Sequence, residues 1–163
     1  TRYGYKTSTT YSFVEPEKAR KMRKAATGDL VLVTTSENLE DVGKPLVWLG
    51  NQELNVGGES YIIRSELDPL YLAHFFMSAD FKRKSNRFIS GTKVKRISAN
   101  SLSKIEIGVP PLEIQKEIVR ILDKLDSLVN SVNEGIPAEI EARRKQYEYY
   151  RNKLLTFKEL ESA

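Results

Sequence analysis

Residues 108–129 read GVPPLEIQKEIVRILDKLDSLV, and this stretch carries the clearest structural signal in the chain. Two prolines, Pro110 and Pro111, end whatever element precedes them, and a helix begins readily after such a pair. From there the apolar side chains recur at alternating steps of four and three, which is the spacing of a coiled-coil seam. The seam consists of Ile114, Ile118, Ile121, Leu125, Leu128 and Val132, widened by Leu122 and Val129. We therefore predict a long amphipathic helix that forms a coiled coil.

A second helical stretch, EIEARRKQYEYYRNKLLTF at 139–157, follows an interruption at Gly135 and Pro137. Glycine favours non-helical backbone, and proline removes an amide donor and restricts the residue before it, so we predict a kink or short break there. The apolar positions then resume at Ile140, Tyr147, Tyr150, Leu154 and Phe157, with Arg143 in one apolar slot. A nearly straight helix over 111–157 would reach on the order of 70 Å. We expect a partner helix to cover its stripe; the alternative is that it folds back on its own globular part.

The first 110 residues contain shorter and more mixed patterns. Apolar runs between turn residues predict strands at 30–34, 45–49, 60–64 and 105–109. Asp68 followed by Pro69 is a typical helix start, and the apolar face beyond it predicts a helix to about Asn86. We expect a shorter helix at 16–24. Because strands and helices do not alternate regularly, we predict an α+β fold, in which a small mixed-strand domain at 1–110 precedes a helical region at 111–163.

Composition excludes several classes of chemistry. The 163 residues include no Cys and one His, which removes disulfides, thiolate nucleophiles and zinc sites built from Cys or from several His. No apolar run approaches the roughly 20 residues that span a bilayer, and the N-terminus lacks the apolar stretch of a signal peptide. We expect a cytoplasmic protein that holds no metal and no cofactor of its own.

Fragments of enzyme motifs occur, but each is incomplete. The sequence GKP at 43–45 lacks the spacing of a phosphate-binding loop, and NVGG at 55–58 is not a dinucleotide-binding fingerprint. DPLY at 68–71 resembles the catalytic tetrapeptide of amino-methyltransferases, but it lacks the second proline and a glycine-rich cofactor strand. His74 lies beside an apolar helix face, where a structural histidine is the common case. We therefore predict that the chain is not an enzyme.

Cations, hydroxyls and aromatic rings instead gather in a few segments. RYGYKTSTT at 2–10 and SGTKVKR at 90–96 combine them in loops, and two further basic runs occupy 18–24 and 82–87. Lys and Arg neutralise phosphates, whereas hydroxyl and amide side chains also contact base edges. Residues 1–110 carry 17 Lys and Arg against 12 Asp and Glu, and the remainder carries 9 against 10. This distribution favours double-stranded DNA as a ligand; the alternative for the two basic runs is a solvated helix face.

Taken together, these stretches resemble one half of the DNA specificity subunit of type I restriction-modification systems. The two helical stretches are similar to the family's conserved helical regions, and three weaker matches to its target recognition domain are ATGDLVLVTTSEN at 26–38, GGESYIIRS at 57–65 and SGTKVKRIS at 90–98. The resemblance implies a target recognition domain that reads one half of a bipartite DNA target. It also implies a spacer helix that docks the modification and restriction subunits, with S-adenosylmethionine expected on the modification subunit.

The full subunit of that family has two recognition domains and two spacer helices, whereas this sequence has one of each. The resemblance therefore implies that the partner of the spacer helix is either the second spacer helix or a second copy of the chain, as a homodimer. It also implies that the domain at 1–110 is N-terminally incomplete, because the strand-rich segment that usually opens such a domain is missing.

Two sets of candidate residues follow. The DNA-binding set combines cations and tyrosines with hydroxyl and amide side chains beside strand ends: Arg2, Tyr3, Tyr5, Lys6, Thr7, Thr9, Thr34, Thr35, Ser36, Asn51, Gln52, Gly91, Thr92, Lys93, Lys95 and Arg96. The partner-helix set comprises Ile114, Ile118, Ile121, Leu125, Leu128, Val132, Tyr147, Tyr150 and Leu154. The alternative function is a helix-mediated protein–protein adaptor without DNA binding, which accounts for the helical region but not for the basic loops.

Overall fold

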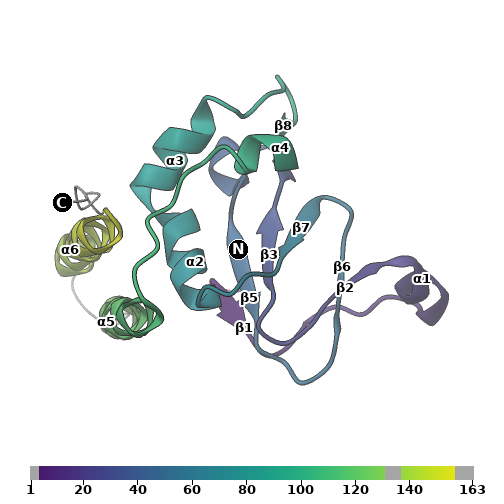
Figure 1. The fold of residues 1–163 in the computed structure, drawn as a ribbon, viewed down its shortest axis with the longest axis horizontal. Helices are drawn as coiled ribbons and strands as arrows, with labels where there is room; N and C mark the ends of the chain where they lie inside the picture. The colour runs from purple at the N-terminus through teal and green to yellow at the C-terminus, as the bar shows by residue number, and fades with distance from the viewer. Residues whose placement is uncertain (1–3, 131–136, 157–163) are drawn as a thin grey trace.

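A four-stranded sheet forms the centre of the globular part in the computed structural model, which describes residues 4–130 and 137–156 (Figure 1). Its strands, in order across the sheet, are β1 Lys6–Thr7, β5 Pro45–Trp48, β3 Leu30–Val33 and β7 Ser60–Ile63. β1 runs parallel to β5, and the other two pairs are antiparallel. The uninterrupted apolar sequence of β3 fits its central position, because both faces of this strand are covered.

Two short ribbons and three short helices flank this sheet. β2 Arg23–Ala25 pairs with β6 Leu54–Val56, and β4 Thr35–Ser36 pairs with β8 Lys95–Arg96, both antiparallel. The short helices are α1 Pro16–Lys21, the 3-10 helix η1 Leu39–Asp41 and α4 Ala99–Leu102. The β2–β6 ribbon covers one face of the sheet, because Ala25 and Val56 pack with Val31 of β3.

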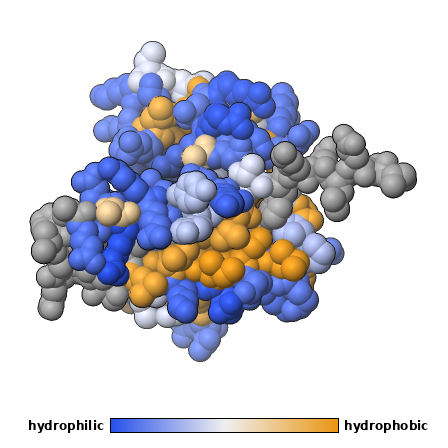
Figure 2. Space-filling model, turned by 90° about the vertical axis from the view of Figure 1, so that its left-hand side faces the viewer, coloured by the Kyte–Doolittle hydropathy of each residue, from blue (hydrophilic) through white to orange (hydrophobic). Residues whose placement is uncertain are grey.

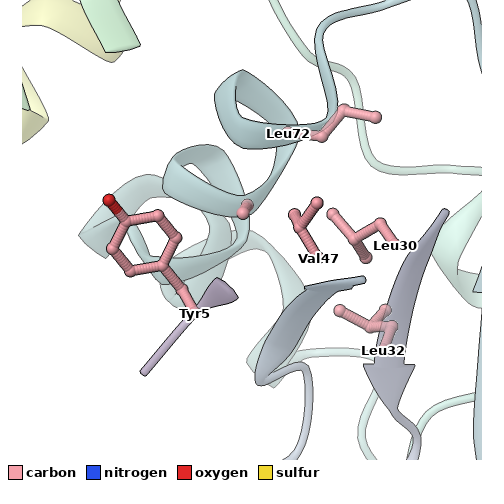
Figure 3. Close-up of a cluster of buried hydrophobic side chains, with 6 residues drawn as sticks. Tyr5, Leu30, Leu32, Val47 and Leu72 are labelled. Carbon is pink, nitrogen blue, oxygen red and sulfur yellow. The ribbon is translucent and has the colours of Figure 1, made fainter. Parts of the chain in front are cut away.

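Helix α2, Pro69–Met77, covers the other face of the sheet. The Asp68 carboxylate caps it by accepting hydrogen bonds from the backbone N–H groups of Leu70 and Tyr71, at 2.9 and 3.1 Å. Ser78 ends α2 and caps α3, Ala79–Asn86, so the chain turns between the two helices. Figure 3 shows the resulting core between α2 and the sheet, formed by Tyr5, Leu30, Leu32, Val47, Leu72 and Ala73.

Two long helices, α5 Leu112–Asn130 and α6 Pro137–Leu155, lie side by side, and α5 also packs on α2 (Figure 1). One buried cluster joins all three helices through Tyr71, Ile118, Val119, Leu122, Tyr147 and Leu155. The helical region is therefore folded back on the globular part, as in the alternative considered above, and the extended rod of about 70 Å is not formed. None of the helices in the described ranges is long and apolar enough to cross a bilayer.

The predicted mixed α+β class with a long C-terminal helix is confirmed, as are the strands at 30–34, 45–49 and 60–64 within a residue at the ends. The strand at 105–109 is wrong: this segment is irregular, and Ile107 packs against the helices instead. The predicted helix to Asn86 is broken at Ser78, and the predicted helix at 16–24 stops at Lys21. The expected kink at Gly135 lies largely outside the described residues.

Candidate nucleic-acid interface

An open cleft of about 700 Å³ lies where β1 and β5 end. Its polar lining combines hydroxyl side chains of residues 7–12 with the amides of Asn51, Gln52 and Asn55. Its apolar lining includes Trp48 and Phe13, whose side chain is 90% exposed. Short polar groups beside apolar surface suit both the hydrogen-bonding edges and the methyl groups of bases.

Local backbone geometry holds this cleft open. The Trp48 indole N–H donates to the Gln52 carbonyl at 2.7 Å, which ties the turn at 49–52 to the end of β5. A Cβ at Gly50 would lie 2.1 Å from the Trp48 ring, so only glycine fits in this turn. The Thr7 hydroxyl accepts from the backbone N–H of Thr9 at 3.3 Å, which bends the opposite wall.

The β4–β8 ribbon carries the second group of predicted DNA-binding residues. Thr34 and Thr35 are buried, and their hydroxyls are used within the fold: Thr34 donates to the Glu59 carbonyl at 2.9 Å, and Thr35 accepts from Arg96 at 3.2 Å. At the tip of the loop before β8, Lys93 is exposed.

Several other members of this group also have defined places in the ribbon. Ser36 is half-buried and accepts from the backbone N–H of Asn38 at 3.1 Å. Gly91 adopts φ +103°, and a Cβ there would lie 1.9 Å from the Val94 carbonyl oxygen. Thr92 is exposed, and Lys95 donates to the Gly91 carbonyl at 2.9 Å, which closes the turn.

The two groups lie at opposite ends of the central strand. The start of β3 lies at the cleft end of the sheet, because Leu30 is opposite Val47 of β5. Val47 in turn pairs with Lys6 of β1, next to the cleft. Val33, at the other end, leads directly into β4. A strand of four residues spans about 13 Å, so the predicted DNA-binding residues form two separate clusters rather than one continuous surface.

Tyr5 and Lys6 belong to neither cluster. The Tyr5 side chain is 8% exposed, and its hydroxyl donates to the Asp123 carboxylate on α5, to which Lys6 also pairs at 2.6 Å. Both polar groups are therefore engaged in contacts within the chain, although the Lys6 side chain remains 37% exposed. Arg2 and Tyr3 lie outside the described residues.

Cations elsewhere divide into structural and exposed ones. Arg23 donates to the carbonyls of Gly57 and Ser60, and Arg64 binds Asp29, so both hold the sheet together. The exposed ones include Lys18, Arg20 and Lys21 on α1, for which no ion pair is found among the described residues. This helix borders the cleft, whose lining includes the neighbouring Val14 and Met22.

The partner-helix residues divide between two faces. Ile118 and Tyr147 are buried within the chain, and Leu125 and Leu154 pack partly against the same cluster. The outward-facing residues are Ile114 at 48% exposed, Leu128 at 46% and Tyr150 at 40%, with Ile121 half-buried. Figure 2, viewed from the side of α5 and α6, shows an apolar band on this surface. Val132 lies outside the described residues.

Sequence reasoning missed Phe13 and Trp48, which contribute to the apolar lining of the cleft. Phe13 is a single aromatic residue in a polar loop. The sequence pattern does not show whether such a residue is buried or exposed, and only the structure shows that it is exposed. Within the described part of the chain, no group of three or more His, Asp or Glu residues is placed to hold a metal ion.

Comparison with known proteins gives a consistent result. Residues 28–142 match the family described as type I restriction modification DNA specificity domain. A putative type I restriction enzyme specificity subunit of Haemophilus influenzae is 38% identical over 112 residues, 69% of this chain and 25% of that protein. The EcoR124I/EcoR124II specificity subunit of Escherichia coli is 43% identical over 95 residues, 57% of this chain and 23% of that protein. The chain thus spans about a quarter of the length of these relatives.

Proposed function

This chain belongs to the family of type I restriction-modification DNA specificity domains, and from that premise we propose that its globular part reads one half of a bipartite DNA target. The observation that carries the proposal is the family match over residues 28–142, which includes the β4–β8 ribbon and the amide wall of the cleft. Specificity subunits select the DNA sequence for partner enzymes, so the chain itself performs no catalysis.

Each cluster has a separate part in this proposal. The β4–β8 ribbon, with Lys93 exposed at its tip, contacts phosphates and fixes the position of the domain on the duplex. The cleft, with Asn51, Gln52 and Phe13, contacts base edges, because amides form paired hydrogen bonds with adenine in the major groove. A duplex groove is about 12 Å wide, comparable to the distance between the two clusters.

Binding to labelled duplexes at several salt concentrations tests the proposal. Replacing Lys93 with Ala lowers the slope of log affinity against log salt by about 0.9, the loss expected for one phosphate contact. Lys145→Ala is the matched control, because Lys145 is exposed on α6, away from both clusters. Replacing Asn51 with Ala instead reduces the affinity ratio between target and non-target DNA, with the slope unchanged. If the wild-type chain shows no salt-dependent DNA binding, it is a helix-mediated adaptor instead.

We further propose that the outward face of α5 pairs with a second spacer helix. Ile114 is 48% exposed and Ile121, seven residues further along α5, is only half-buried, so this side of the helix presents apolar residues at coiled-coil spacing. In a full-length subunit the second spacer helix fills this place in antiparallel orientation; in the chain alone, a second copy does so as a two-fold dimer. The modification and restriction subunits then dock on the paired helices.

Sedimentation of the wild-type chain and of Ile114→Asp tests the pairing. Burying an unpaired carboxylate in the seam is strongly unfavourable, so the variant is monomeric where the wild type dimerises. Ser127→Asp, an exposed position on the same helix, leaves the dimer intact. A wild-type chain that stays monomeric at tens of micromolar, about the concentration at which a weak dimer forms, contradicts this part of the proposal.

A further inference from the structure

Three side chains of the globular part, from β1, from the residue just before it and from α2, converge on one carboxylate of α5. Lys6 lies 2.6 Å from Oδ2 of Asp123, and Nε2 of His74 lies 3.1 Å from Oδ1. The Tyr5 hydroxyl donates to the same Oδ1, and the Tyr5 and His74 rings are 4.7 Å apart. Tyr5 is also part of the sheet core (Figure 3), and His74 is fully buried on α2. Asp123 therefore connects β1 and α2 to the helix that leaves the domain.

The charges in this network are strongly coupled. Burial acts to raise the pKa of the Asp123 carboxyl, but hydrogen bonds from His74, Lys6 and Tyr5 outweigh it and hold that pKa well below its usual range. Burial, together with the hydrogen bond to Asp123, raises the pKa of the Tyr5 phenol above its usual range. Asp123 is therefore an ion held by directional, charge-assisted contacts.

A second polar contact lies eight residues earlier on the same buried face. Gln115 is 2% exposed, accepts from the backbone N–H of Asp68 at 2.9 Å, and donates to the Pro110 carbonyl at 2.8 Å. Eight residues of helix rise about 12 Å, so α5 is held at two points roughly two turns apart. Between these points its contacts with α2 are apolar, and apolar contacts lack direction.

Two fixed points determine the direction of a rod. We propose that Asp123 and Gln115 are positioning residues that fix the angle at which α5 leaves the recognition domain, and thereby the separation of the two DNA half-sites read by paired chains. This inference rests on the proposed function. The 19 residues of α5 extend about 28 Å, so a tilt of about 10° moves its far end by about 5 Å. The rise of one base pair is about 3.4 Å, so even this small tilt changes the preferred spacing.

The angle can be measured without DNA. The natural sequence has no cysteine, so replacing Lys82 on α3 and Ser127 on α5 with Cys gives two specific spin-label sites on exposed positions. Pulsed electron paramagnetic resonance then reports the distance distribution between them. We expect one narrow distribution of label-to-label distances in the protein that carries only the two Cys replacements. Adding Asp123→Asn should broaden or shift that distribution. Glu117→Gln is the matched control, because the ion pair of this α5 carboxylate within residues 4–130 and 137–156 is with Arg120 on the same helix.

Two further variants keep the test decisive if Asp123→Asn fails to fold. Tyr5→Phe removes one hydroxyl and keeps the ring in the core, and Lys6→Met removes one charge from a partly exposed side chain. Each removes one of the three contacts, so we expect a smaller broadening in both. A distribution that is unchanged in every folded network variant overturns the inference.

The DNA experiment separates this inference from the proposed function. Duplexes selected by the wild-type chain from a random pool are rebuilt with one base pair more or fewer between the half-sites. Asp123→Asn should bind the duplexes of altered spacing with affinities within about 3-fold of its affinity for the best spacing. Its affinity for a single half-site should differ from that of the wild type by less than about 2-fold. If the wild type binds no DNA, the proposed function fails while the distance measurement still tests the angle. A broadened angle with an unchanged spacing preference refutes the link between them.

Discussion

Replacing Leu122 with Ala tests which face of α5 is buried against the domain. Leu122 is fully buried, in the cluster that joins α5 to α2 and α6, whereas Ile114 on the same helix is 48% exposed. Truncating Leu122 removes apolar groups worth about 0.8 kcal/mol each and leaves a cavity, so we expect a loss of about 3 kcal/mol in the free energy of unfolding. For a chain of this size, that corresponds to a melting temperature lower by about 6–12 °C. Ile114→Ala should cost about 1 kcal/mol or less.

Urea unfolding followed by circular dichroism at low micromolar concentration provides the assay. The two variants should differ by at least about 2 kcal/mol under these conditions. Equal losses, or a larger loss for Ile114→Ala, would refute the packing of α5 described above. Repeating the titration at about a hundred times the concentration adds a second comparison: the cost of Ile114→Ala should rise if this face pairs with a second copy, because dimerisation then contributes to stability.

Three further outcomes are expected. The pKa of Asp123 in the folded chain lies below its ordinary value near 3.8. The stability that ionised Asp123 contributes is therefore complete above about pH 4 and is lost as the pH falls toward the pKa of the folded state. We expect the difference in urea midpoint between the wild type and Asp123→Asn to shrink from pH 7 to pH 3. Gln115→Leu leaves two backbone groups without their partners and should cost about 2–4 kcal/mol in thermal melting, whereas Lys116→Leu at the exposed neighbouring position should cost under about 0.5 kcal/mol. Gly91→Ala should destabilise by about 1–3 kcal/mol, because φ is +103° there. Gly58→Ala is the control, because a Cβ added at Gly58 would contact no atom within 4 Å beyond its chain neighbours, and equal melting temperatures for the two variants would contradict the expectation.

Local signals in the sequence were sufficient for the central elements. The uninterrupted apolar run of β3 and the Asp68-Pro69 start of α2 depend on neighbouring residues, and both are found where predicted. The alternation of Ile105 and Ile107 is equally typical of a strand. In the structure this segment instead lies against α2, where the Tyr71 hydroxyl donates to the Gly108 carbonyl at 2.7 Å. Burial there raises the pKa of Tyr71 to about 12.

The buried face of α5 was beyond a reading of the sequence because its apolar stripe is wide. The helix has apolar residues on two overlapping faces, and spacing alone does not tell which one meets the domain. The polar Gln115 lies on the buried face, whereas the apolar Ile114 beside it is exposed. Hydrogen bonds to the backbone at Asp68 and Pro110 explain this reversal, and they require a tertiary structure that no local pattern encodes.

The candidate DNA-binding residues were chosen by side-chain chemistry, which does not indicate where each side chain points. Asn51 and Gln52 are exposed in the cleft, but Thr34 and Thr35 are buried. The sequence pattern suggested that the Tyr5 hydroxyl is free to contact DNA. In the structure this hydroxyl instead donates to Asp123, a residue 118 positions away. Predicting such a long-range contact requires the packing of α5, which the sequence left open.

The anchoring of α5 has a consequence for recombination between specificity genes and for chimaeras made in the laboratory. The double proline at 110 and 111 looks like a natural crossover point, but a junction there would separate Asp68 and Tyr5 from the helix residues that bind them. A junction after Leu122 still separates Tyr5 and His74 from Asp123. The exchangeable unit is therefore the globular part together with about the first four turns of α5, and grafts that keep residues up to Leu125 should retain the donor's geometry as well as its DNA preference.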